Sequence, residues 1–117
     1  MAGSVRTTAA AALLVSALCI SPVQAQSPDA SLAQDLSSCA GAVAAHANLD
    51  VLAYPRGASG EWAPLLGAIL ERLSVEPGVE GMTGRYAASA ARQFWSEQSG
   101  SEREAAANQC RARFGGQ

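Results

Sequence analysis

Apolar residues recur at helical spacing along most of the chain, and the first such stretch predicts a helix that starts near Pro28. Its apolar positions follow one another at intervals of three or four residues, which places them on one face of a helix. They are Leu32, Leu36, Cys39, Val43 and either His46 or Ala47. We expect this helix to end between Ala47 and Tyr54, because Pro55 disfavours a helical conformation of the residue before it.

The second stretch predicts a helix over about residues 61–73 that forms the centre of the core. Pro64 is compatible with it because proline is tolerated in the first turn, where its missing N–H has no partner to lose. Six large apolar residues cover a wide face of this helix. They are Trp62, Leu65, Leu66, Ile69, Leu70 and Leu73.

Two further helices are predicted after the Pro77-Gly78 turn. Over residues 83–98, a spacing of four places Tyr86, Ala90 and Phe94 on one stripe, with Trp95 at its edge. The last helix follows a break at residues 99–101. We expect a capping box formed by Ser101 and Glu104 at its start. Its inward face would then consist of Ala106, Cys110 and Phe114.

The pattern as a whole predicts an all-α fold, a small bundle of about four helices. No stretch alternates between polar and apolar residues as a half-buried strand does. Cys39 lies on the inward face of the first helix and Cys110 on that of the last. Because a disulfide requires the two Cα atoms to lie close together, we expect one disulfide that joins these two helices as neighbours.

The amino terminus is typical of a secretory signal peptide. Arg6 precedes an apolar stretch over residues 9–20, and Val23-Gln24-Ala25 offers small residues for cleavage before Gln26. We expect residues 1–25 to be the signal and residues 26–117 to form a single domain. Cys19 would leave with the signal, although lipoprotein processing at Cys19 is a minor alternative. Two cysteines in an oxidising compartment are expected to pair.

Composition narrows the choice of compartment and partners. The formal net charge is −2, every basic residue is arginine, and alanine is abundant. An acidic balance argues against nucleic acid and anionic lipid as partners. The arginine and alanine bias is typical of GC-rich bacterial genomes, so we expect a periplasmic or secreted protein of a Gram-negative bacterium with no membrane span after signal cleavage. Leu, Ile, Val and Phe make up only about 16% of the predicted domain, so the disulfide should contribute strongly, by roughly 4 kcal/mol.

Few residues could carry chemistry. His46 could pair with Asp50 one turn later, but metal sites need three or four ligands and none stands at suitable spacing. We therefore prefer a packing role for His46. The chain has no nucleophile elbow, haem attachment motif or Cys-x-x-Cys pair. We expect no catalytic residues, no metal, no cofactor and no enzymatic activity.

The segment 49–62 is the candidate recognition surface. Tyr54 and Arg56 flank a proline on a connection expected to be exposed, Trp62 follows, and Tyr, Arg and Trp often anchor protein interfaces. The alternative is that Tyr54 and its apolar neighbours cover the open end of a thin core, and we prefer that interpretation. For Trp62 the alternative is likewise a place in the core.

These patterns favour a non-enzymatic periplasmic interaction or accessory protein with a protein partner. An alternative is a small-ligand carrier or stress chaperone with an apolar cleft between helices, and a third is an enzyme with an unrecognised site. An exposed apolar patch would favour the first, an apolar cavity the second, and His46 beside two carboxylates or a serine the third.

Overall fold

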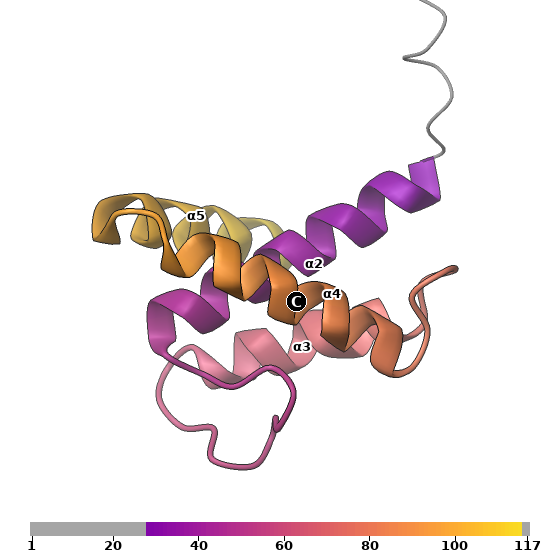
Figure 1. The fold of residues 1–117 in the computed structure, drawn as a ribbon, viewed down its shortest axis with the longest axis horizontal. Coiled ribbons are helices and arrows are strands. Elements are labelled where there is room, and N and C mark those ends of the chain that lie inside the picture. Colours follow the sequence, from indigo (N-terminus) through magenta and orange to yellow (C-terminus); the bar gives the residue numbers. More distant parts are fainter. Residues whose placement is uncertain (1–27, 116–117) are drawn as a thin grey trace, which may run out of the picture.

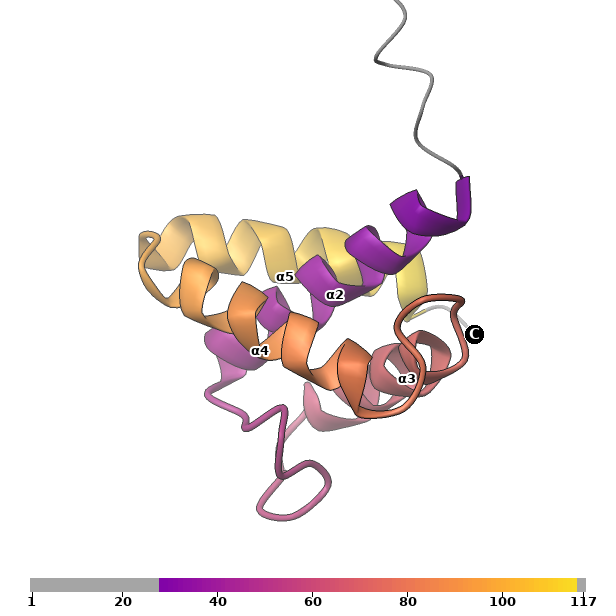
Figure 2. The same ribbon diagram turned by 45° about the vertical axis from the view of Figure 1, so that its right-hand side comes forward.

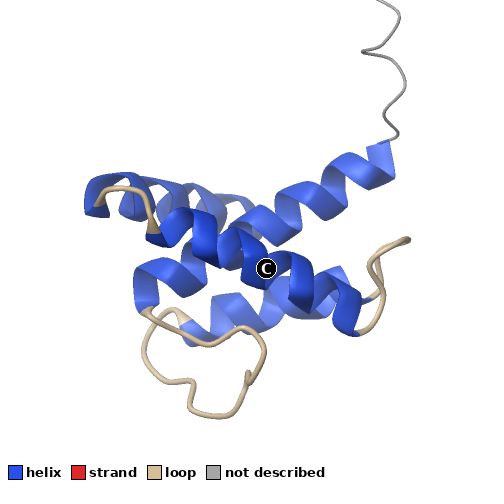
Figure 3. Cartoon of the chain, in the orientation of Figure 1, coloured by secondary structure: helices blue, strands red, loops and turns tan. Residues whose placement is uncertain are grey.

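The computed structural model describes residues 28–115, which form four α-helices and no strand (Figures 1 and 3). The helices are α2 (Pro28–Ala47), α3 (Ala63–Ser74), α4 (Met82–Ser96) and α5 (Gly100–Phe114). Figures 1 and 2 show α2 running between α4 and α5, with α3 on a third side. The predicted all-α bundle is confirmed, whereas the predicted signal peptide, residues 1–25, lies outside the described residues.

Helix α3 supplies more of the large side chains in the core than any other helix of the described residues, as its sequence pattern predicts. Its buried residues are Leu65, Leu66, Ile69, Leu70 and Leu73. Trp62, directly before the helix, is also buried, and Pro64 stands in the first turn. Full burial of one such aliphatic side chain is worth about 1.5–3 kcal/mol, so α3 contributes a large share of the apolar stabilisation.

Helices α2 and α4 pack through small residues instead. Ala40 and Ala44 of α2 and Ala88 of α4 are completely buried. A Cβ atom added at Gly41 would lie 2.5 Å from the Cβ of Ala91, well inside the distance of any normal contact. The two backbones therefore approach each other more closely than any residue other than glycine at position 41 allows.

The α4 stripe that the sequence spacing identifies faces outward. Tyr86 is 61% exposed and Phe94 is 54% exposed, and Ala90 between them is exposed too. The helix has a second apolar face made of small residues, and its buried positions are Gly84 and Ala88. Only this small face can approach the alanine- and glycine-lined surface of α2 closely, so the larger side chains are turned away from it.

The beginning of α5 also differs from the prediction. The capping box uses Ser99 and Glu102, not Ser101 and Glu104: the Ser99 hydroxyl accepts from the Glu102 N–H, and the Glu102 carboxylate accepts from the Ser99 N–H. Both serine and glutamate pairs have the required spacing of three, and Gly100 is incorporated as the first residue of the helix. The helix therefore begins two residues earlier than the later pair would allow.

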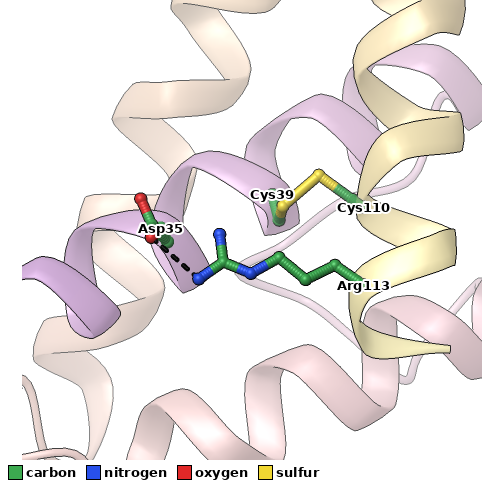
Figure 4. A network of polar contacts seen from close by, with 4 residues as sticks. All are labelled: Asp35, Cys39, Cys110 and Arg113. Carbon is green, nitrogen blue, oxygen red and sulfur yellow. Dashed lines mark ion pairs between the residues drawn. A yellow bond between two sulfur atoms is a disulfide. The ribbon is translucent and has the colours of Figure 1, made fainter. Parts of the chain in front are cut away.

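Helix α5 is attached to α2 by the predicted disulfide. Cys39 and Cys110 are bonded, with their Cα atoms 5.5 Å apart, and one turn away Arg113 forms an ion pair of 3.0 Å with Asp35 (Figure 4). The apolar contact is small, because the buried residues of α5 are only Ala107, Cys110 and Phe114, with Ala106 partly buried. Exposed ion pairs contribute little, so the covalent bond is the main attachment of this helix.

Candidate functional site

The segment between α2 and α3, residues 48–62, is a folded series of turns rather than an open loop. Asn48 adopts a left-handed conformation with φ of 57° and ends α2. The Asp50 carboxylate accepts hydrogen bonds from the N–H groups of Leu52 and Ala53, at 2.9 and 3.1 Å. Leu49 and Val51 alternate with these polar positions and are buried in the core. The start of the segment thus belongs to the packed interior.

Tyr54 lies half-buried over the start of α3. Its hydroxyl donates a hydrogen bond of 3.0 Å to the carbonyl of Ala63, and its ring packs against the core cluster. Gly67 lies directly beneath it, where any Cβ atom would collide with the tyrosine hydroxyl. These contacts fit the interpretation of Tyr54 as a cover on the core, and they leave only part of its ring accessible to a partner.

Two arginines of α4 hold this segment from the other side. Arg85 donates to the carbonyls of Val51 and Tyr54, at 3.2 and 2.6 Å. Arg92, two turns later, donates from Nε to the carbonyl of Leu49 at 2.7 Å and from Nη2 to the Asn48 side chain. Sequence reasoning missed both roles. The spacing of seven residues places the two side chains on one helix face, but no sequence signal identifies backbone carbonyls as their partners.

The three residues proposed as partner-binding differ in how much of each side chain is exposed. Arg56 is exposed, Tyr54 is half-buried and Trp62 is only 9% exposed. The Trp62 indole meets the His46 ring edge-on, with ring centroids 5.1 Å apart, and the Arg111 guanidinium of α5 lies 4.2 Å from its centroid. Trp62 therefore connects α2, α3 and α5 through aromatic and cation–π contacts.

The groups with potential chemistry have structural contacts in this arrangement. His46 packs against Trp62, the Asp50 carboxylate binds backbone N–H groups, and the two cysteines are bonded to each other. Across residues 28–115, no three histidine, cysteine or acidic side chains gather as a metal site requires. In the same part of the chain, no helix is long and apolar enough to cross a membrane.

The outer face of α4 contains the stripe that the sequence spacing identifies. It carries Met82, Tyr86 and Phe94, which are 48%, 61% and 54% exposed. Tyr86 stands four residues after Met82 and eight residues before Phe94, so its side chain lies near both along the outer side of the helix. The Phe94 ring also meets the Trp95 ring edge-on. The amphipathic signal identified this stripe correctly but not the direction in which it points.

A shallow apolar groove lies on another side of α4, between α2 and the 77–79 turn. Its volume is about 420 Å³. Its lining is made mostly of small or apolar residues: Ala33, Gln34, Ser37, Ser38, Pro77, Gly78, Val79, Ala87 and Ala91. The Ser37 hydroxyl is already occupied, since it donates to the Ala33 carbonyl. This surface offers a ligand shape and apolar contact but few polar groups for specificity.

Comparison of the chain with protein-family models, with curated proteins and with solved structures finds no match.

Proposed function

We propose that this chain is an exported, non-enzymatic interaction protein that binds its partner through the outer face of α4. The observation that carries the proposal is the exposure of Tyr86 and Phe94 on one helical stripe. Isolated exposed apolar residues are ordinary, but a row of large ones on a rigid helix is typical of interaction sites. Tyrosine in particular combines a large apolar surface with a hydroxyl that can bind a partner.

The exposed stripe contrasts with the 49–62 segment, our sequence-based candidate. There the side chains of Tyr54 and Trp62 contact the core, whereas the rings of Tyr86 and Phe94 on α4 are exposed over more than half of their surface, with Phe94 beside residues of α5. Arg56 remains exposed and could contribute at the rim of a larger interface. The structural contacts of His46, Asp50 and the cysteines support a role without catalysis.

A photo-crosslinking residue at position 94 tests this function. Residues 1–117 are expressed in a Gram-negative host whose own envelope proteins are present. Crosslinking is compared with the same photoreactive residue in place of Ala112, which is exposed on α5. We expect protein adducts from position 94 and none from position 112. Absence of any protein adduct from position 94, with the chain folded and disulfide-bonded, would refute the proposal.

Export is part of the same proposal. It is supported by the signal-like amino terminus and by a disulfide, which is typical of oxidising compartments. The intact mass of the protein from a periplasmic extract should correspond to a chain that starts at Gln26. A full-length cytoplasmic product, or a lipid-sized mass increment on Cys19, would contradict it.

The groove beside α2 favours a second candidate function, that of a small-ligand carrier. Its volume of about 420 Å³ lies within the range of small-molecule sites. Binding of a fluorescent apolar probe should then be lost when Ala87→Phe fills the groove and should be unaffected by Phe94→Ala on the outer face. Equal probe binding by both variants would count against the carrier.

A further inference from the structure

The outer face of α4 is arranged symmetrically about Ala90. Tyr86 stands four residues before it and Phe94 four residues after it, while Thr83 and Glu97 stand seven residues before and after. All five residues are exposed. On a helix these spacings place the five positions along one side. The spacing of these positions is the same on both sides of Ala90.

The charge at the two ends of this face is also distinctive. The N-terminus of α4 has no side-chain cap and no acidic residue in its first turn, so the positive end of its dipole lacks a negatively charged partner, although the Thr83 N–H donates to the Glu80 carbonyl at 3.3 Å. Glu80, the nearest preceding acid, accepts a hydrogen bond from Gly78 instead. At the other end, Glu97 is exposed beside the negative end of the helix and accepts only a long bond from Gln93, at 3.4 Å.

We propose that the partner of this face is a second copy of the chain, paired antiparallel with a two-fold axis at Ala90. This inference rests on the proposed function of the α4 face. The pairing places Tyr86 against the partner copy's Phe94 position and Glu97 beside the partner copy's Thr83 and uncapped helix N-terminus. Each of these contacts occurs twice, as two-fold symmetry requires.

Charge complementarity favours a second copy over an unrelated partner. Helix α4 has no acidic residue at its positive N-terminal end, but it has Glu97 at its negative C-terminal end, where a carboxylate is unfavourable. Antiparallel pairing of two copies brings each Glu97 to the N-terminal end of the other helix. The carbonyl groups at the end of α4 already have a cationic partner, because Arg103 donates to the carbonyls of Ser96 and Gln98. Glu97 therefore remains free to face the other copy.

The middle of the face contains no bulky side chain and no free positive charge that would keep the two helices apart. Ala90 is small and allows two helices to approach closely, and the basic residues of the helix, Arg85 and Arg92, are committed to the 48–54 segment. A single helix pair is small compared with the roughly 1,600 Å² of a standard interface, so we expect a weak dimer with a Kd of about 1–100 μM.

Sedimentation of the oxidised chain over a concentration series gives the primary test. We expect reversible monomer–dimer behaviour, and Tyr86→Ala or Phe94→Ala should weaken association by roughly tenfold or more. The control, Val75→Ala, truncates another exposed apolar residue, at the end of α3, and should leave association unchanged. Urea melts at dilute concentration establish that each variant folds as the unsubstituted chain does.

Opposite charges at Thr83 test the direction of pairing. Thr83→Lys should strengthen the dimer, since it adds a cation opposite Glu97 of the other copy, although it places a cation at the positive end of its own helix. Thr83→Glu should do the reverse: it stabilises the isolated helix end but weakens the dimer severalfold. Because monomer stability and association change in opposite directions, a merely structural effect cannot imitate the result.

Engineered cysteines test the register. With the axis at Ala90, Ala90→Cys should form an intermolecular disulfide under mild oxidation. Tyr86→Cys alone should not, because its two copies lie about 12 Å apart along the helices. A mixture of Tyr86→Cys and Phe94→Cys chains should crosslink again. Crosslinking of Tyr86→Cys with itself, or a dimer strengthened by Thr83→Glu, would overturn the antiparallel arrangement.

The outcomes separate this inference from the proposed function. An adduct from position 94 with twice the mass of the chain supports both. A chain that stays monomeric up to about 1 mM, while position 94 crosslinks to a different protein, overturns the second copy and leaves the interaction function standing. A monomer that forms no protein adduct overturns both.

Discussion

Helices α3 and α4 are similar in length and both strongly amphipathic, yet they use their apolar faces in opposite ways. Helix α3 buries five large aliphatic side chains, whereas α4 buries Gly84 and Ala88 and exposes Tyr86 and Phe94. The surfaces they meet explain the difference. Leucines of α3 fill space between helices, while Gly41 and the alanines of α2 leave α4 a surface that only small residues can approach.

The largest expected effect comes from the disulfide, which attaches α5 to α2. Cys39→Ser and Cys110→Ser should each lower the free energy of unfolding by about 4 kcal/mol, because either change opens the same long loop. Urea melts of the two variants measure this. Unequal losses, or unchanged melting, would show that the covalent bond is not the main attachment of α5.

A direct comparison of the two helices comes from truncating one large side chain in each. Leu66→Ala should cost about 3 kcal/mol, because it removes a fully buried side chain and leaves a cavity. Tyr86→Ala at dilute concentration should change stability by about 0.5 kcal/mol or less. A loss above roughly 2 kcal/mol from Tyr86→Ala would place this residue in the core and remove α4 as a recognition surface.

The close approach of α2 and α4 is tested at glycine. Gly41→Ala should destabilise the fold by about 1–3 kcal/mol, since the new Cβ atom would overlap Ala91 and the backbone of Arg92. Gly100→Ala is the matched control, because the nearest atom to its Cβ position is 3.8 Å away on a flexible arginine. The control should be neutral or stabilising by about 0.4–1 kcal/mol. Similar melting of Gly41→Ala and the control would contradict the packing described for α4.

The smallest expected effect concerns the 48–62 segment, which contacts both helices. Tyr54→Phe removes the hydroxyl that binds the Ala63 carbonyl and should cost about 0.5–1.5 kcal/mol. Arg56→Ala should be almost silent, because this side chain is exposed. If Arg56→Ala is the more destabilising change in thermal melts, the segment is held by contacts other than those of Tyr54.

Local sequence patterns were sufficient to predict packing where a helix has only one apolar face that can be buried. The spacing of Leu65, Leu66 and Ile69 identified α3 as a core helix, and the inward positions of Cys39 and Cys110 identified the disulfide. Both inferences use helical periodicity, which short-range backbone geometry imposes, and the disulfide also follows from the expected oxidising compartment. The capping box failed for the opposite reason: two overlapping Ser-x-x-Glu pairs satisfy the same local rule.

The candidate site depended on more than local pattern. Sequence composition drew attention to Tyr54, Arg56 and Trp62, but it could not indicate that Trp62 packs between His46 and Arg111 or that Arg85 and Arg92 bind backbone carbonyls. Such contacts join residues far apart in the sequence. Every residue has a backbone carbonyl, so the type of the accepting residue does not indicate that an arginine will bind there.

The sequence by itself determined that this chain is an all-helical bundle with its first and last helices joined by a disulfide, because periodicity and cysteine position are local properties. Only the tertiary structure decided which of two apolar faces α4 buries. That choice depends on the shape of α2 at Gly41, where the close approach of two backbones excludes large side chains and turns Tyr86 and Phe94 outward.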